Sequence, residues 1–157
     1  MTTSAFSIEP EPIGSARAGE VLQRYAGELT ERFPSGFDSG RAAPPGKTDF
    51  DPPQGIFLLV WSGGEPAGCG ALRTQSAGIG EIRRMWVAPS LRGRGAGRAL
   101  LVELERQAWQ LGFGAVRLDT ATELHEAKAL YRSAGYVEVP AYNDNAYAGH
   151  WFEKTLG

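Results

Sequence analysis

The sequence has only one cysteine, Cys69, and only two histidines, His125 and His150. An intrachain disulfide is therefore excluded, and we expect Cys69 to be a small buried apolar residue rather than a nucleophile. Neither histidine has a partner at metal-ligand spacing, so no metal site is expected. The 16 basic and 18 acidic residues nearly cancel, which leaves no general positive field to attract nucleic acid.

Long apolar runs are absent as well. No segment approaches the length that spans a membrane, and the N-terminus lacks a basic segment followed by an apolar core. We therefore expect a cytoplasmic protein without a membrane partner. With 157 residues, 42% of them hydrophobic, residues 1–157 are long enough for one core and are expected to form one domain.

Hydrophobic periodicity predicts three helices and seven strands, in an order typical of a mixed α/β sheet covered by helices. The expected strands are Phe6–Pro10, Ile56–Trp61, Pro66–Leu72, Glu81–Val87, Val116–Asp119, Tyr136–Val139 and His150–Leu156. The expected helices are Ala16–Phe33, Leu100–Leu111 and Leu124–Ala134.

Residues 34–55 and the strand Glu81–Val87 allow more detailed predictions. Residues 34–55 are rich in Pro, Gly and Asp, and we expect an ordered loop anchored by Phe37 and Phe50 rather than disorder. In the strand Glu81–Val87, strict alternation would place Ile82, Arg84 and Trp86 on one face. A bulge would shift that register.

The segment Arg92–Arg98 reads RGRGAGR and joins a predicted strand to a predicted helix. Glycines let the backbone approach an anion closely, and the first helical N–H groups have no intrahelical partners. The helix dipole adds about half a positive charge at the same end. This turn is therefore a predicted phosphate site.

The spacing within this turn decides between kinds of phosphate ligand. A dinucleotide fingerprint that starts at Gly93 would need Gly or Ala where Arg98 stands, and no Lys-Ser or Lys-Thr pair follows for a triphosphate loop. The order Arg92-x-x-Gly95-x-Gly97, preceded by the sequence MWVAP, instead resembles the acetyl-CoA signature of the GCN5-related N-acetyltransferases (GNAT superfamily). The segment LYRSAGY at 130–136 resembles the superfamily's second landmark, so the resemblance covers roughly residues 81–139.

The resemblance implies a fold and a co-substrate. It implies a mixed, mostly antiparallel sheet with helices on both faces, in which the strands Glu81–Val87 and Ala115–Asp119 splay apart and the pantetheine arm of acetyl-CoA enters the gap. Backbone groups of the first strand would bind that arm and polarise the thioester carbonyl. The positions that match the family's acetyl-CoA site are Met85, Trp86, Val87, Arg92, Gly93, Arg94, Gly95, Ala96, Gly97 and Arg98. Core packing of Met85 and Trp86, and plain solvation of the arginines, are the competing interpretations.

Tyr131 matches the family's usual general acid, which would protonate the thiolate that leaves coenzyme A. Simple packing within the helix stripe is the alternative for this residue. Attack on the thioester also requires a neutral amine, so some group must accept the amine proton. Glu81 is the candidate base, with Asp119 as a weaker candidate, although either could be a surface carboxylate.

The segment 142–151 is rich in aromatic, amide and acidic groups, which suits recognition of an acceptor beside a cleft. The candidate acceptor-binding residues are Asp119, Tyr142, Asn143 and Asn145. A simple Asn-Asp turn is the alternative. Carboxylates in this region would favour a cationic acceptor.

Together these features predict an acetyl-CoA-dependent N-acetyltransferase in which the amine of a small molecule, or a protein lysine or N-terminus, attacks directly in a ternary complex. A non-catalytic acyl-CoA-binding module is the alternative, and a nucleotide or nucleic-acid binder is weaker still. The sequence identifies neither the acceptor nor the acyl length, and it leaves the oligomeric state open, a homodimer included.

Overall fold

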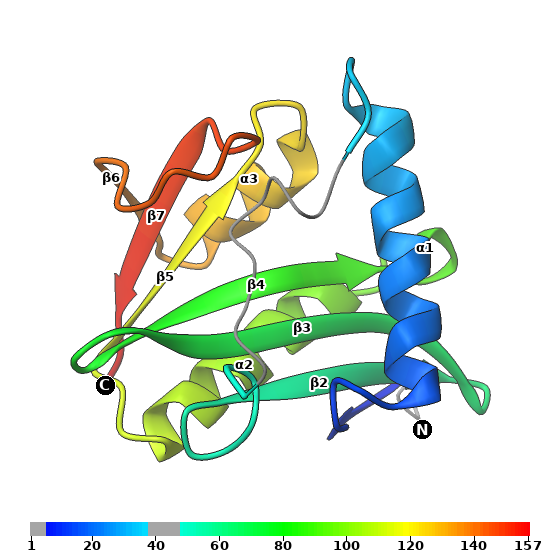
Figure 1. Cartoon of the computed structure of the whole chain (residues 1–157), viewed down its shortest axis with the longest axis horizontal. Coiled ribbons are helices and arrows are strands. Elements are labelled where there is room, and N and C mark those ends of the chain that lie inside the picture. The colour runs from blue at the N-terminus through cyan, green and yellow to red at the C-terminus, as the bar shows by residue number, and fades with distance from the viewer. Residues whose placement is uncertain (1–5, 38–47) are drawn as a thin grey trace.

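The computed structural model describes residues 6–37 and 48–157 of the chain (Figure 1). This part of the chain forms one sheet with helices packed against it. The strands are β1 Ser7–Pro10, β2 Gly55–Ser62, β3 Glu65–Ser76, β4 Ile79–Val87, β5 Ala115–Thr120, β6 Val137–Val139 and β7 His150–Thr155. The helices are α1 Ala16–Arg32, α2 Ala96–Gln110 and α3 His125–Ser133, with a short 3-10 turn at Pro89–Leu91. In the described residues, no helix combines the length and apolar character needed to cross a bilayer.

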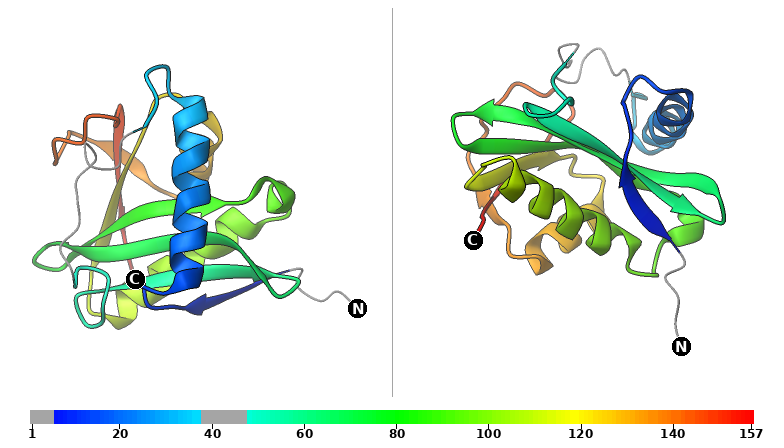
Figure 2. Two further views of the ribbon diagram at one scale, coloured as in Figure 1. Left: turned by 45° about the vertical axis from the view of Figure 1, so that its right-hand side comes forward. Right: turned by 90° about the horizontal axis from the view of Figure 1, so that it is seen from below.

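The sheet has seven strands in the order β1-β2-β3-β4-β5-β7-β6. All neighbouring pairs are antiparallel except β4 and β5, which are parallel and are connected through α2. The helices cover both faces: α1 lies on one side of the sheet, and α2 and α3 lie on the other (Figure 2). This arrangement confirms the α/β fold that the sequence predicts.

Both helix layers depend on simple packing rules. The N-cap residue Ser15 accepts a hydrogen bond from the Ala18 amide (3.1 Å), and α1 buries a stripe that includes Val21 and Leu29. On the other face α2 packs closely on β3. A Cβ atom at Gly70 would lie only 2.8 Å from Leu104 Cδ1, so the absence of a side chain at position 70 lets this helix approach.

The centre of the sheet is splayed, as predicted. The register between β4 and β5 covers only three pairs, from Ile79 opposite Ala115 to Glu81 opposite Arg117. Beyond Glu81 the two strands diverge, and Figure 1 shows the resulting V between them. The later part of β4 therefore has β3 on one side and no partner strand on the β5 side within the described residues.

The strict alternation predicted for the strand Glu81–Val87 is wrong because β4 contains a bulge. Arg83 pairs with Ala71 and Trp86 pairs with Cys69, so two residues, Arg84 and Met85, lie opposite Gly70. Trp86 consequently shares a face with Arg83, where its indole reaches Glu28 of α1. Arg84 has a positive φ of 53°, which is uncommon for a residue with a side chain.

Three further local predictions concern the start of α2, the burial of Cys69 and the positions of Phe37 and Phe50. The second helix begins at Ala96, directly after its N-cap residue Gly95, which has a left-handed conformation. Cys69 is fully buried, and burial raises the pKa of its thiol to about 12, which confirms its apolar role. Phe50 is buried and the Phe37 ring contacts that of Phe33, whereas residues 38–47 of the predicted ordered loop lie outside the described part.

Candidate active site

A cavity of about 440 Å³ lies at the end of β4, beside the glycine-rich turn. Its walls come from the end of β4, the glycine-rich turn, α1 and α3. Nine of the ten residues predicted for acetyl-CoA line it, namely Met85, Trp86, Val87, Arg92, Gly93, Gly95, Ala96, Gly97 and Arg98. Arg94 is exposed and does not line this cavity.

The glycine-rich turn has the open backbone that an anion cradle requires. Gly93 and Gly95 have positive φ angles of 76° and 82°, and no atom lies within 4 Å of a Cβ added at either position. Gly95 is the N-cap of the 15-residue helix α2, so the first amides of this helix and its positive dipole end face the cavity. The turn can therefore bind a diphosphate through its backbone.

Gly95→Ala tests this turn. A left-handed conformation costs a residue with a side chain about 1–2 kcal/mol, so we expect the turn to rearrange and the KM for acetyl-CoA to rise about tenfold. Steady-state kinetics with varied acetyl-CoA measure this effect. Gly114→Ala is the matched control, because Gly114 has ordinary φ and open space around it. An unchanged KM for Gly95→Ala would remove the turn from the proposed site.

The arginines of the turn are already engaged with the protein. Arg92 donates from Nε to the Val87 carbonyl (3.1 Å) and pairs with the carboxylate of Glu28 (2.5 Å). Arg98 donates to the hydroxyl of Ser133 at the end of α3 (2.6 Å). These contacts hold both guanidinium groups beside the turn, where Arg98 adds positive charge and the charge of Arg92 is balanced by Glu28.

Glu28 connects α1 to this part of the site. Its carboxylate accepts hydrogen bonds from the Arg92 guanidinium and from the Trp86 indole (3.1 Å), and it lies 3.5 Å from Arg32. Burial raises the pKa of Glu28, but the hydrogen bonds from Arg92 and Trp86 outweigh burial and hold this pKa below its usual value. Glu28 therefore stays ionised at neutral pH and fixes the position of Arg92.

A second cavity, of about 340 Å³, lies on the α1 side of β4 and β5. It is bounded by α1, by β4 and β5, and by the segment around residues 145–147. Six residues line both cavities: Tyr25, Leu29, Met85, Leu124, Ala127 and Tyr131. The two cavities therefore meet at Tyr131 and Met85.

Tyr131 lies on α3 at this junction and is buried. Its ring contacts the rings of Tyr136 (5.9 Å between centroids) and Phe152 (6.0 Å). Burial raises the pKa of Tyr131 well above its usual value, so its hydroxyl keeps its proton at neutral pH. Packing in the helix stripe and a position that suits a proton donor are thus compatible for this side chain.

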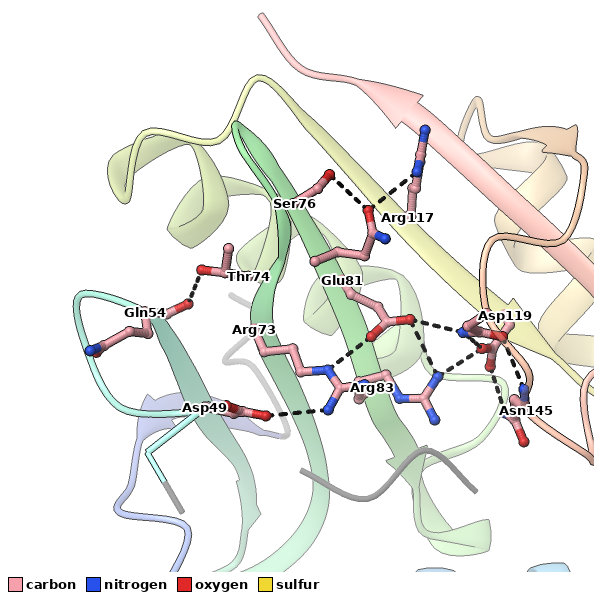
Figure 3. Close-up of polar contacts among 12 residues, drawn as sticks. Asp49, Gln54, Arg73, Thr74, Ser76, Glu81, Arg83, Arg117, Asp119 and Asn145 are labelled. Carbon is pink, nitrogen blue, oxygen red and sulfur yellow. Dashed lines mark hydrogen bonds and ion pairs between the residues drawn. The ribbon is translucent and has the colours of Figure 1, made fainter. Parts of the chain in front are cut away.

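The predicted base, Glu81, lies in a buried network of charges (Figure 3). Its carboxylate accepts a hydrogen bond from Arg73 Nε (2.9 Å) and lies 3.6 Å from the Arg83 guanidinium. Arg83 pairs in turn with Asp119 (2.8 Å). Only 2% of the Glu81 side chain is exposed, and Glu81 lines neither cavity.

The predicted acceptor residues lie around Asp119 but have different surroundings. Asp119 and Asn145 line the second cavity, and the Asn145 amide donates to Asp119 (3.1 Å). Asn143 donates to both Asp119 (2.6 Å) and Glu81 (3.2 Å), so it connects the two carboxylates. Tyr142 lies outside both cavities, with its ring 5.3 Å from the guanidinium carbon of Arg117.

A profile of the Acetyltransferase (GNAT) family matches residues 10–136, and this range includes the splayed strands, the glycine-rich turn and Tyr131. The chain belongs to the GNAT acetyltransferase family. A segment of 83 residues is 37% identical to a protein named IAA acetyltransferase from Azospirillum brasilense. That match covers 52% of this chain and 54% of the relative, so the chain spans about half the length of this relative.

Solved structures of GNAT proteins share the fold over nearly the whole chain. A Klebsiella pneumoniae protein described as an acyl-CoA N-acyltransferase is 26% identical, with a TM-score of 0.78 over 99% of this chain and 100% of that one. A GNAT family acetyltransferase from Elizabethkingia anophelis, solved with acetyl-CoA bound, has a TM-score of 0.67 at 17% identity. That likeness covers 98% of this chain and 100% of the Elizabethkingia chain.

The charges in this GNAT chain differ from the expectation of a cationic acceptor. Glu81 and Asp119 are carboxylates near the site, as predicted, but Arg73 and Arg83 neutralise them. Burial lowers the pKa of Arg83, yet Asp119 and Glu81 outweigh burial, and this pKa is raised above its usual value. These carboxylates therefore leave little free negative charge to attract a cation.

Sequence reasoning missed several residues that line the two cavities. An aromatic wall of the second cavity is formed by Tyr25 of α1, by Phe33 directly after this helix, and by Phe37 and Tyr147. The helical spacing of Tyr25 and Phe33 was a usable signal, but it could not distinguish a core stripe from a cavity wall. In the described residues, no three His, Cys, Asp or Glu side chains cluster to hold a metal ion.

Proposed function

We propose that this chain transfers an acetyl group from acetyl-CoA to the amine of a small molecule by direct attack in a ternary complex. The observation that carries this proposal is that the two cavities meet at Tyr131 and Met85. One cavity has the glycine-rich cradle, and the other has a volume typical of small-ligand sites. A direct transfer needs both reactants side by side, which this junction allows.

Acetyl-CoA fits the residues of the first cavity. The amides of Gly93–Gly97 and the guanidinium groups of Arg92 and Arg98 would hold its diphosphate. The edge of β4 that faces away from β3 would hydrogen-bond to the amides of its pantetheine arm. When bound there, acetyl-CoA supplies an activated acetyl group as a thioester.

Tyr131 completes the transfer. As the amine nitrogen forms a bond to the thioester carbonyl carbon, the carbon–sulfur bond breaks and the thiolate takes the proton of the Tyr131 hydroxyl. The raised pKa of Tyr131 ensures that this proton is present. Solvent then restores the proton to the phenolate.

The amine proton takes a different route. Asp119 lines the second cavity. Glu81 does not line it, but Asn143 donates hydrogen bonds to both carboxylates. We propose that Asp119 accepts the amine proton, directly or through water, and that Glu81 supports it through the Arg83 and Asn143 contacts that the two carboxylates share.

Thiol release tests this function. Incubation with acetyl-CoA and a panel of primary amines is expected to release one thiol for each amine acetylated, with no release when the amine is omitted. A thiol reagent is suitable because Cys69 is buried and its raised pKa suppresses its reaction. Absence of amine-dependent thiol release across a broad panel would contradict the proposed function.

A further inference from the structure

Within residues 6–37 and 48–157, Arg84 differs from the nearby Arg73 and Arg83 in having no carboxylate partner. Arg73 pairs with Asp49 and Glu81, and Arg83 pairs with Asp119 and Glu81. Among the described residues Arg84 forms no ion pair, although it is half-buried and lines the second cavity. A partly desolvated guanidinium without a counter-ion is unfavourable, so this position is suited to an incoming anion.

The backbone of β4 is distorted at this residue. Arg84 lies in the bulge opposite Gly70 and has a φ of 53°. Such a conformation is strained for a residue with a side chain, and bulges beside active sites often redirect a side chain. On the α1 side of the sheet, the guanidinium carbon of Arg84 lies 5.9 Å from the Phe50 ring.

The rest of the second cavity supplies an apolar wall. The Phe33 and Tyr147 rings stack with centroids 5.2 Å apart, and Phe37 lies 4.9 Å from Tyr147. Tyr25 lies edge-on to Phe37 at 6.3 Å and extends this wall to the junction of the two cavities. Aromatic rings arranged in this way favour a ligand with an apolar body.

The charge balance of the cavity is positive. Its carboxylate, Asp119, already accepts hydrogen bonds from Arg83, Asn143 and Asn145. Arg83 is neutralised by the same Asp119 and by Glu81, which leaves Arg84 as the uncompensated charge among the described lining residues. A negative group on the ligand would balance it.

We propose that the acceptor is a free α-amino acid with an apolar side chain, whose carboxylate pairs with Arg84. This inference rests on the proposed function and names its substrate class. Arg84 and Met85 both line the second cavity, and Met85 lies where the two cavities meet, so a carboxylate bound by Arg84 would lie in the same cavity as the reacting amine. That arrangement fits an α-amino acid, whose amine and carboxylate share one carbon, with its side chain against the aromatic wall.

The test compares phenylalanine with phenethylamine, which differ only in the carboxylate. We expect the wild type to acetylate phenylalanine with a kcat/KM at least tenfold higher. In Arg84→Gln this preference should disappear through a higher KM for phenylalanine, with an unchanged KM for acetyl-CoA. Arg84→Lys keeps the charge and should retain part of the preference, and Arg106→Gln is the control at an exposed arginine outside both cavities.

Other outcomes overturn the inference. If Arg84 only packs on Phe50, Arg84→Gln lowers the melting temperature and affects both amines equally. Calorimetry with N-acetylphenylalanine and N-acetylphenethylamine separates this inference from the proposed function, because it needs no turnover. A preference for N-acetylphenylalanine that Arg84→Gln abolishes supports the carboxylate site even where thiol release fails. Equal affinities, or no binding of either compound, contradict it.

Discussion

Tyr131→Phe is expected to lower kcat about 100-fold and to leave the affinity for acetyl-CoA unchanged. The substitution removes only the hydroxyl, so the ring keeps its packing against Tyr136 and Phe152. Without that hydroxyl the thiolate leaves with no proton donor at the junction of the two cavities. Steady-state kinetics give kcat, and calorimetry with acetyl-CoA gives the dissociation constant.

Tyr136→Phe is the matched control for this experiment. Tyr136 lies beside Tyr131 and is also buried, but its hydroxyl donates to Glu105 of α2 (2.8 Å). Loss of this hydrogen bond should lower the free energy of unfolding by about 1 kcal/mol and should change kcat very little. If Tyr131→Phe retained wild-type kcat, or if both substitutions reduced kcat equally, Tyr131 would have a packing role and the assignment of the proton donor would be wrong.

Glu81→Gln is expected to lower the free energy of unfolding by about 3 kcal/mol, because it leaves two buried arginines with less compensating charge. Arg73 loses its 2.9 Å partner, and Arg83 retains only Asp119. For a chain of this size the melting temperature should fall by roughly 6–12 °C. Urea and thermal unfolding measure both quantities, and a pH profile of kcat in the same variant shows whether Glu81 contributes to proton transfer.

Glu138→Gln provides the comparison for an exposed charge. Glu138 pairs with Arg132 (2.8 Å) and His150 (2.9 Å), but about half of its side chain is exposed, so solvent screens the pairs. We expect no measurable change in the unfolding midpoint. A similarly small effect for Glu81→Gln would show that the network in Figure 3 contributes little to stability.

The parts of the site that sequence predicts well are the ones built from consecutive residues. The turn from Arg92 to Arg98 is a local structure, because its glycines and the start of α2 follow one another in the chain. The same holds for the stripe of α3 that contains Tyr131. Nine of the ten predicted acetyl-CoA positions consequently line one cavity.

The acceptor side could not be predicted in the same way, because it depends on which strands pair and in what register. Arg73 meets Glu81 only because β3 and β4 pair at that point, and Asp119 joins them from β5 and Asn143 from the segment before β7. The bulge at Arg84 shifts the side chains that follow it, and no local pattern indicated it. The sequence therefore predicted carboxylates near the site but not the arginines that neutralise them.

The most direct test of this account is a crystal structure of the chain with acetyl-CoA. We predict that the diphosphate lies against the amides of Gly93–Gly97, that the pantetheine arm runs along β4 at Met85–Val87, and that the thioester lies beside Tyr131. Acetyl-CoA bound elsewhere, or β4 paired with β5 along Met85–Val87 so that the gap is closed, would contradict the account.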